Sequence, residues 1–370
     1  MFMENKFIPV SEPNITQKEL KYVVSAVKSG WVSSLGEFIT RFEDKFASFI
    51  GTKYALAVSN GTTGLHLALA SLGIKKGDEV IIPDLTFVAT ANAVLYTGAI
   101  PVLVDIDPFT WCIDPKAILK AITPKTKCII PVHLYGQPAN MDEINNIAKK
   151  FNLYVVEDCA EAHGAEFRGK KVGSLGTCGV FSFYGNKIIT TGEGGMITTN
   201  NRKLYETACL LRDHAMSKKK KYWHERVGFN YRLTNIQAAL GLAQLERIDN
   251  LIDKKINIFS WYKNNLEKLK NIRLNPESLW AKNVYWMICL YLTDSKVSRQ
   301  NLMEKLKSNH IDSRPFFYPI SQMPLYKQFK HGNNKQSYQA SQHGLNLPSS
   351  TKLTKKDVDY ICQIIKKILN

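Results

Sequence analysis

The chain has 370 residues, of which 45% are hydrophobic, so it is long enough for a large domain with a substantial core and a smaller second domain. Its seven cysteines include no CxxC pair, which favours a reduced, cytoplasmic protein over a disulfide framework. No apolar run approaches the roughly 18 residues of a membrane helix, and the N-terminal sequence has no apolar signal segment. We therefore expect no membrane insertion.

The chain carries 49 basic and 32 acidic residues, a formal net charge of +17. Such a balance suits either nucleic acid or a substrate that carries a diphosphate. The lysines are spread along the sequence, and the only dense run, Lys218–Lys221, is typical of a solvated loop. We expect an anionic small-molecule substrate and no nucleic-acid partner.

The N-terminal region predicts two amphipathic helices, at 16–29 and 38–51. Gly30 ends the first of them. Four apolar residues share one face of this helix: Leu20, Val23, Val24 and Val27.

A strand at 54–59 is followed by the sequence NGTTG and a helix at 65–73. This order places the backbone N–H groups of Gly61 and Thr62 at a helix N-terminus, where phosphates bind. An ordinary strand–helix turn with a threonine cap is the alternative.

Strands and helices then alternate. Strands are predicted at 78–83, 101–107, 128–134 and 153–160, with helices at 86–98, from 115 and at 141–151. Alternating apolar strands and helices predict an α/β fold with a mostly parallel, doubly wound sheet. Ligands bind at the carboxyl ends of such strands, where Asp84–Phe87, His133–Gly136 and Glu157–Asp158 fall.

One lysine, Lys187, follows a strand at 179–183 and precedes the glycine-rich turn GEGG at 192–195. Aromatic and small apolar residues flank it, so burial can lower its pKa and make the amine nucleophilic, as Schiff-base chemistry requires. The alternative is an exposed lysine on a loop, which is the usual place for this residue.

Asp158 ends an apolar strand, and a buried carboxylate needs a partner. A protonated pyridine nitrogen and a helix terminus are both suitable. Lys187 and Asp158 together match pyridoxal phosphate, which needs an amine for its aldehyde and an acid for its ring nitrogen.

The pattern changes near residue 250. A loop at 222–234 leads into a long helix from Asn235 to Ile248, and a helix, a strand at 284–292, a helix at 298–309 and a loop at 313–319 follow. We expect a large domain at 1–249, which includes the N-terminal helices, and a smaller α+β domain at 250–370.

Six motifs in this order resemble the nucleotide-sugar aminotransferases: SNGTTGLHLAL, PDLTFVAT, VEDCAEAHGA, FSFYGNK with TGEGG, GFNYRLTNIQAALGLAQL and RPFFYP. The resemblance covers nearly the whole chain. It implies the aspartate aminotransferase fold (fold type I), with a large seven-stranded sheet, and pyridoxal phosphate as cofactor. WVSSLGEF, YWHERVGFNYR and VYWM make the resemblance greatest to the members that aminate a GDP-linked sugar.

The resemblance implies roles for individual residues. Lys187 matches the lysine that binds the cofactor aldehyde, and Asp158 matches the acid at the ring nitrogen. Gly61, Thr62 and Ser182 match the phosphate-binding positions.

Further matches concern the ring, the substrate and the assembly. Phe87 matches the residue that packs on the cofactor ring, and Glu161 lies where many members have glutamine near the ring hydroxyl. Asn230 matches a residue that reaches the phosphate of the neighbouring subunit's cofactor, which implies a homodimer with shared active sites. Arg314 and Tyr318 match a loop that faces substrate.

The expected reaction is transfer of an amino group from L-glutamate to C4 of a GDP-linked 4-keto-6-deoxyhexose, for a surface polysaccharide. The same reaction on a UDP- or dTDP-linked sugar is the main alternative. A dehydratase is disfavoured because the dehydratases of the family carry histidine in place of Lys187. A non-catalytic binding protein is disfavoured by the presence of Lys187, Asp158 and the phosphate turn together. No metal is expected.

Overall fold

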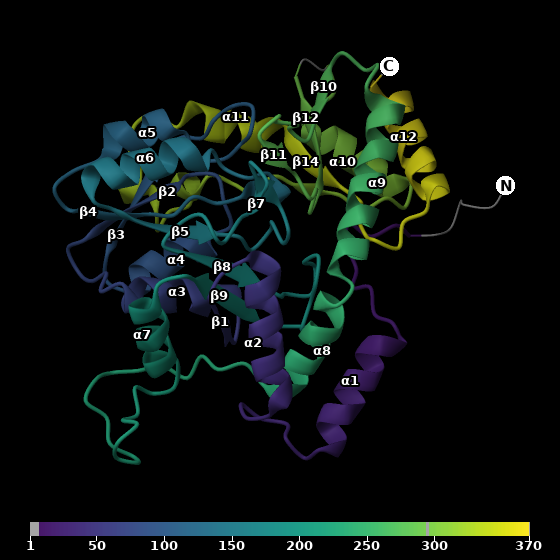
Figure 1. Ribbon diagram of the computed structural model, residues 1–370. Coiled ribbons are helices and arrows are strands. Elements are labelled where there is room, and N and C mark those ends of the chain that lie inside the picture. Colours follow the sequence, from purple (N-terminus) through teal and green to yellow (C-terminus); the bar gives the residue numbers. More distant parts are fainter. Residues whose placement is uncertain (1–6, 294–295, 370) are drawn as a thin grey trace.

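The structure, a computed structural model, describes residues 7–293 and 296–369. Its largest sheet has seven strands in the order β1-β9-β8-β5-β4-β2-β3 (Figure 1). Neighbouring strands are parallel except around β9, which is antiparallel to both β1 and β8. The strand bounds are Tyr54–Val58 (β1), Glu79–Pro83 (β2), Ile100–Val104 (β3), Thr126–Ile129 (β4), Tyr154–Asp158 (β5), Cys178–Ser182 (β8) and Gly195–Thr199 (β9). The predicted mostly parallel sheet is confirmed.

Helices cover both faces of this sheet (Figure 1). On β2, Val80 and Ile82 belong to one buried cluster and Ile81 to the other, so alternate side chains face opposite layers. Burial on both faces explains the continuous apolar runs in the sequence. One layer contains α3 (Gly61–Ser71), α4 (Ala89–Tyr96) and α7 (Arg202–Arg212), and the other α2 (Glu37–Ile50), α5 (Pro115–Ala121), α6 (Met141–Phe151) and α8 (Asn235–Leu245).

The C-terminal part contains a second, antiparallel sheet in the order β10-β12-β14-β13. A third buried cluster lies between this sheet and its helices. The bounds are Ile272–Leu274 (β10), Ile288–Leu292 (β12), Arg314–Pro315 (β13), Gly344–Leu347 (β14), Ile248–Leu266 (α9), Arg299–Ser308 (α10), Lys335–His343 (α11) and Lys355–Leu369 (α12). A small third sheet joins β11 (Ala281–Lys282) to β6 (Glu166–Phe167) and β7 (Lys170–Lys171).

The expected domain division at 249/250 falls in the first turn of α9 and stays a prediction. The N-terminal segment crosses that division, because Ile8 pairs with Ile311 and belongs to the C-terminal buried cluster. Residues 1–6, which the expected large domain includes, lie outside the described residues.

Helix α1 (Gln17–Lys28) forms as predicted, and a capping box between Thr16 and Glu19 fixes its start. Its predicted apolar face is not buried within this chain: Leu20 is 53% exposed and Val27 53%. The face that packs on α8 instead carries Glu19, which bonds Gln244 and Arg247 at 2.7 and 2.9 Å. The outward stripe is therefore free in the single chain.

Several predicted elements end early, among them one strand and one helix. The strand expected at 128–134 stops at Ile129, because Pro131 lacks an N–H donor and the chain turns at Tyr135, which has a φ of 54°. The helix expected to run to Ile248 ends at Leu245, and α9 begins three residues later. Within 7–293 and 296–369, no helix combines the length and apolar character that a membrane crossing needs.

Candidate active site

A cavity of about 700 Å³ opens at the carboxyl ends of the parallel strands. The large sheet supplies most of its wall, and Trp286, Arg314 and Phe317 close it from the C-terminal part. Eight of the ten residues predicted for the site line this cavity: Gly61, Thr62, Phe87, Asp158, Glu161, Ser182, Lys187 and Arg314. Sequence positions more than 250 residues apart are thus brought together.

Lys187 lies in the loop after β8, where its backbone N–H closes a turn on the Tyr184 carbonyl at 2.9 Å. The side chain is only 11% exposed, so the alternative of a surface lysine is wrong. Burial lowers the pKa of its amine, while the carboxylates of Glu161 and Asp158 act in the opposite direction. A larger fraction of free amine at neutral pH follows.

Asp158 ends β5 and is 5% exposed. One carboxylate oxygen accepts from the hydroxyl of Thr90 at 2.8 Å, and the other accepts from the N–H of Ala160 at 3.1 Å. Burial raises the pKa of Asp158, and these hydrogen bonds oppose the rise. The carboxylate is therefore fixed in orientation and directed at the cavity that it lines.

A buried hydrogen-bond network braces the same strand end. Glu157 accepts from the Nε2–H of His133 at 3.0 Å and from the N–H groups of Gly173, Leu175 and Gly176. Since the N–H of Ala139 donates to Nδ1 of His133 at 3.0 Å, that nitrogen carries no proton. The network joins β5 to two loops behind Asp158.

The N-terminus of α3 also lines the cavity. Asn60 caps the helix through a bond from the N–H of Thr63, so the cap is asparagine and not the threonine of the alternative turn. The N–H groups of Gly61 and Thr62 donate to no other described residue. A Cβ on Gly61 would lie 2.9 Å from Cβ of Ser182, so only glycine allows α3 to approach β8 this closely.

Glu161 accepts a hydrogen bond from the N–H of Tyr135 at 2.8 Å, and its other oxygen lies 3.8 Å from Nζ of Lys187. Burial raises the pKa of Glu161 to about 7, and Lys187 opposes this rise. The unusual backbone of Tyr135, with φ above zero, presents its N–H to the carboxylate. The phenol of Tyr135 accepts from the N–H of Phe317 at 3.0 Å, which ties the C-terminal loop to the site.

Phe87 is 57% exposed and lies 5.9 Å from the ring of Phe317. An apolar ring left uncovered at a cavity wall offers a surface for a flat ligand. Arg314 pairs in register with Asn346 across two strands, and both line the cavity.

Two predicted residues do not line the cavity. Asn230 is exposed on the long loop before α8, where its side-chain oxygen accepts from Arg232 at 3.0 Å. Tyr318 is 51% exposed and lies next to the wall residue Phe317 without lining the cavity itself.

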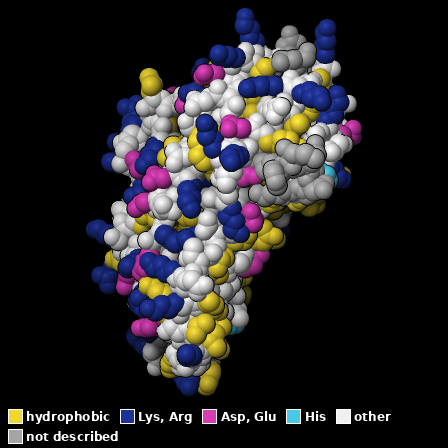
Figure 2. Space-filling view, turned by 90° about the vertical axis from the view of Figure 1, so that its right-hand side faces the viewer, with side chains coloured by type: hydrophobic (Ala, Val, Ile, Leu, Met, Phe, Trp, Pro, Cys, Tyr) yellow, Lys and Arg dark blue, Asp and Glu magenta, His cyan; other side chains and the backbone are white. Residues whose placement is uncertain are grey.

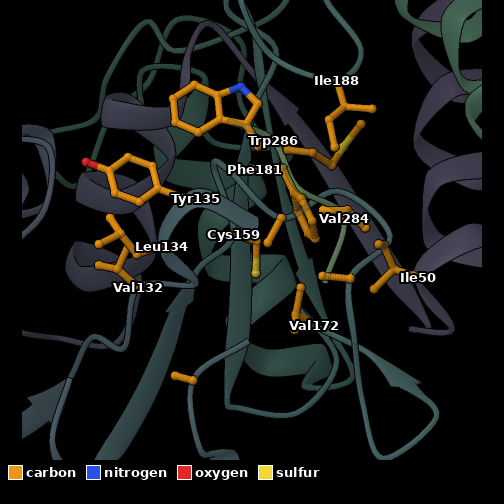
Figure 3. Close-up of a cluster of buried hydrophobic side chains, with 14 of the residues drawn as sticks. Ile50, Val132, Leu134, Tyr135, Cys159, Val172, Phe181, Ile188, Val284 and Trp286 are labelled. Carbon is orange, nitrogen blue, oxygen red and sulfur yellow. The ribbon is translucent and has the colours of Figure 1, made fainter. Parts of the chain in front are cut away.

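Sequence reasoning missed Thr90, Tyr135 and Trp286 as site residues. Thr90 lies in the motif PDLTFVAT and Tyr135 in the strand-end sequence His133–Gly136, but their bonds to Asp158 and Glu161 depend on how the loops fold. Trp286 stands in the motif VYWM, far from Lys187 in the sequence. Figure 3 shows its indole beside the ring of Tyr135, at a centroid distance of 6.3 Å.

The residues present fit pyridoxal phosphate. A buried primary amine is available for an aldehyde, and a fixed carboxylate for a ring nitrogen. Two unpaired N–H groups at a helix start, next to the Ser182 hydroxyl, suit a phosphate. The uncovered ring of Phe87 suits a planar heterocycle.

Comparison with known proteins agrees with this chemistry. Residues 13–366 match the DegT/DnrJ/EryC1/StrS aminotransferase family. The chain belongs to this aminotransferase family. Aminotransferases of the family use pyridoxal phosphate, so the predicted enzyme class and cofactor are confirmed.

Individual relatives cover almost the whole aminotransferase. GDP-perosamine synthase of Caulobacter vibrioides is 47% identical over 364 residues, which are 98% of both chains. The protein of the same name from Escherichia coli O157:H7 is 45% identical, again over 98% of both chains. The crystal structure of an aminotransferase from Psychrobacter cryohalolentis superposes with a TM-score of 0.93 at 32% identity, over 98% of each chain. The predicted fold is confirmed.

Proposed function

We propose that this aminotransferase moves an amino group from L-glutamate to C4 of a GDP-linked 4-keto-6-deoxyhexose and so makes GDP-perosamine. The observation that carries the proposal is the convergence of Lys187, Asp158 and the α3 N-terminus on one cavity. The two relatives named GDP-perosamine synthase, at 47% and 45% identity, support the choice of sugar and nucleotide. The product is a building block for a surface polysaccharide.

Different cavity residues would bind different parts of pyridoxal phosphate. Lys187 would bind the aldehyde carbon, Asp158 the ring nitrogen, and Gly61, Thr62 and Ser182 the phosphate. Phe87 would cover one face of the ring and Glu161 would lie at the ring hydroxyl. When bound, the cofactor supplies an electron-withdrawing ring that stabilises negative charge on the carbon that loses its proton.

Lys187 is the general base. Its buried amine has a lowered pKa, which favours the free base, so it can accept a proton from the carbon that bears the donor nitrogen. In the second half of the reaction the same side chain can donate a proton to C4 of the sugar. Glu161, 3.8 Å away, stabilises the ammonium formed when the amine takes that proton. The carboxylate of Asp158 would stabilise a positive charge on the ring nitrogen, because Thr90 and Ala160 hold the carboxylate in place by hydrogen bonds.

Arg314 is the guanidinium of the cavity wall. No carboxylate among the described residues lies within 4.0 Å of it, so its charge is available to an anionic substrate. We assign Arg314 and the neighbouring Tyr318 to substrate binding.

We further infer that the protein is a homodimer with shared active sites. The exposed apolar face of α1 continues into the loop that follows the helix. Six apolar side chains of this helix and loop are between 40% and 63% exposed: Leu20, Val24 and Val27 on the helix, and Trp31, Val32 and Leu35 in the loop. Figure 2 shows the face of the molecule that lies on the right in Figure 1. In its lower part, at the height of α1, hydrophobic side chains gather along one side. A contiguous apolar surface of this kind is typical of an interface.

Asn230 supports the same inference. It lies outside the cavity of its own chain, on an exposed loop that extends beyond the body of the molecule near α7 (Figure 1). In a twofold dimer we place Asn230 at the phosphate end of the partner's cavity. A cytoplasmic location is proposed from the seven free thiols, since an oxidising compartment favours disulfides.

Turnover with a matched set of substrates tests the proposal. The purified enzyme with glutamate should aminate the GDP-linked 4-keto-6-deoxyhexose with a kcat/KM at least ~100-fold above that for the UDP- and dTDP-linked analogues, since a site that bonds one base rejects another strongly. Equal or higher values for a UDP- or dTDP-sugar would overturn the assignment of the nucleotide.

A further inference from the structure

Trp286 contacts the Lys187 loop in two ways. The Nζ atom of Lys187 lies 3.9 Å from the centroid of the Trp286 ring. The indole N–H donates to the backbone carbonyl of Asn186 at 2.9 Å, and the hydroxyl of Ser11 donates to the same carbonyl at 3.3 Å. The tryptophan thus fixes both the backbone just before Lys187 and the amine at the end of its side chain.

The ring and the Glu161 carboxylate enclose the amine, since Glu161 lies 3.8 Å from Nζ. A lysine side chain has four rotatable bonds and loses considerable freedom when it is held. An aromatic face attracts an ammonium, most strongly where water is excluded. These contacts hold the amine in the cavity at one place.

Trp286 is itself anchored from behind by a second buried lysine. Nζ of Lys255, on α9, donates to the Trp286 carbonyl at 2.9 Å and also to the carbonyl of Ser349. Lys255 is 2% exposed, and no carboxylate among the described residues lies within 4.0 Å of its amine. A second donor to the Trp286 carbonyl is the Ser349 hydroxyl, at 3.2 Å.

A buried ammonium without a counter-ion is costly unless its N–H groups are bonded. Lys255 meets this condition with the carbonyls of Trp286 and Ser349, so movement of the tryptophan backbone would remove one of the acceptors that its amine needs. Ser349 extends the connection to the N-terminal segment, because its N–H donates to the carbonyl of Val10 at 2.8 Å.

We propose that Trp286 is a positioning residue that holds the amine of Lys187, and that Lys255 is the buried anchor that fixes Trp286. The inference rests on the proposed function only for the catalytic role of Lys187. It goes beyond that function because it connects the rate of proton transfer to a lysine that does not line the cavity.

The first experiment observes the amine directly, in the full-length protein without cofactor. The protein is labelled with [ε-13C]lysine, and the Lys187 methylene resonance is identified by its loss in Lys187→Arg. Ring currents should shift this resonance upfield of exposed lysines. Trp286→Leu should abolish the shift and Trp286→Phe should keep much of it, whereas Trp280→Leu, which removes a tryptophan outside the cavity, should leave it unchanged.

The anchor is tested in the same spectra. Lys255→Met should move the Lys187 resonance toward the exposed position, whereas Lys263→Met, on the solvent side of α9, should not. If Lys255→Met fails to fold, Ser349→Ala removes the other donor to the same carbonyl and makes the same test. An unchanged Lys187 resonance in Trp286→Leu, or in the folded anchor variant, would overturn the proposal.

Kinetics of the loaded enzyme complete the test. A misplaced base slows the chemical step, so Trp286→Leu and Lys255→Met should lower kcat by roughly 10- to 100-fold with little change in KM. Partial recovery in Trp286→Phe is expected from the retained ring. If the Lys187 resonance is shifted upfield but the protein aminates no nucleotide sugar, the proposed function alone is contradicted. If the enzyme is active but the Lys187 resonance is not shifted, this inference alone is contradicted.

Discussion

The amine of Lys187 lies 3.8 Å from a carboxylate oxygen of Glu161, and burial moves their pKa values toward each other. The pKa of Lys187 is lowered, and that of Glu161 is raised to about 7. Each group opposes the effect of burial on the other, so the ammonium of Lys187 and the carboxylate of Glu161 each favour the charged form of the other.

Glu161→Gln should lower the pKa of Lys187 further, because the favourable charge beside the ammonium is removed. The measurement is the pH dependence of Lys187 modification by a small amine reagent in the cofactor-free protein, followed by peptide mass spectrometry. Glu193→Gln, at an exposed acid of the same cavity, is the control; equal pKa values in Glu161→Gln and wild type would show that the pair does not interact.

Lys187→Ala should reduce transamination by about a thousand-fold or more, because both the nucleophile and the general base are lost. The fold should stay intact, since the substitution removes one loop side chain, and circular dichroism checks this. Lys282→Ala, at an exposed lysine paired with Glu166, should retain full turnover. Normal turnover in Lys187→Ala would refute the assignment of the base.

Asp158→Asn should retain some cofactor and lose at least roughly 100-fold in rate. The amide still accepts from Thr90 at its oxygen, but it has no negative charge with which to keep a ring nitrogen protonated. Single-turnover kinetics measure the chemical step. The control is Asp105→Asn, at a carboxylate outside the cavity that accepts from two N–H groups in the first turn of α11. A rate near wild type for Asp158→Asn would make Asp158 purely structural.

Mixing two inactive variants tests the shared site. The Lys187→Ala subunit keeps the wild-type Asn230. The Asn230→Asp subunit keeps the wild-type Lys187 but places a negative charge at the phosphate-binding end of the partner's cavity. After subunit exchange, about half of the dimers are heterodimers, and one of the two sites in each heterodimer has both wild-type residues. Roughly a quarter of wild-type activity should therefore return. Exchange without recovery, or an active monomer in sedimentation, would contradict the dimer model.

Lys255 predicts a pH dependence of stability. Burial lowers its pKa from 10.5 to about 7, so between these values the unfolded chain binds a proton that the folded chain does not. The free energy of unfolding therefore rises with pH across this window, by at most about 1.4 kcal/mol per unit from this group, and levels off below it. Melting curves at pH 7 and pH 9 should show this rise in wild type relative to Lys255→Met; parallel curves would argue against a neutral buried amine.

Local sequence patterns were sufficient to predict the large sheet and the cavity residues that lie at the ends of its strands. Strand ends that carry Asp158 and Ser182, and the turn with Gly61, lie at one edge because parallel strands bring their carboxyl ends together. Lys187 follows directly from the strand that Ser182 ends. For these residues, chain order and sheet geometry determine position.

Long-range partners could not be predicted. Trp286 reaches Lys187 only because the C-terminal part packs over the sheet edge, and no spacing in the sequence records that contact. The spacing of the apolar residues in α1 predicts a helix with one apolar face, but it does not say whether the surface that covers this face belongs to the same chain. Leu20 and Val27 are exposed for this reason.

Transfer of a labelled amine tests the central claim most directly. The purified enzyme is incubated with L-[15N]glutamate and the GDP-linked 4-keto-6-deoxyhexose, and the nucleotide-sugar product is analysed by mass spectrometry and NMR. The account predicts a GDP-sugar with 15N bonded to C4, formed with one equivalent of 2-oxoglutarate and absent with Lys187→Ala. A product without 15N, or 15N at another ring carbon, would contradict it.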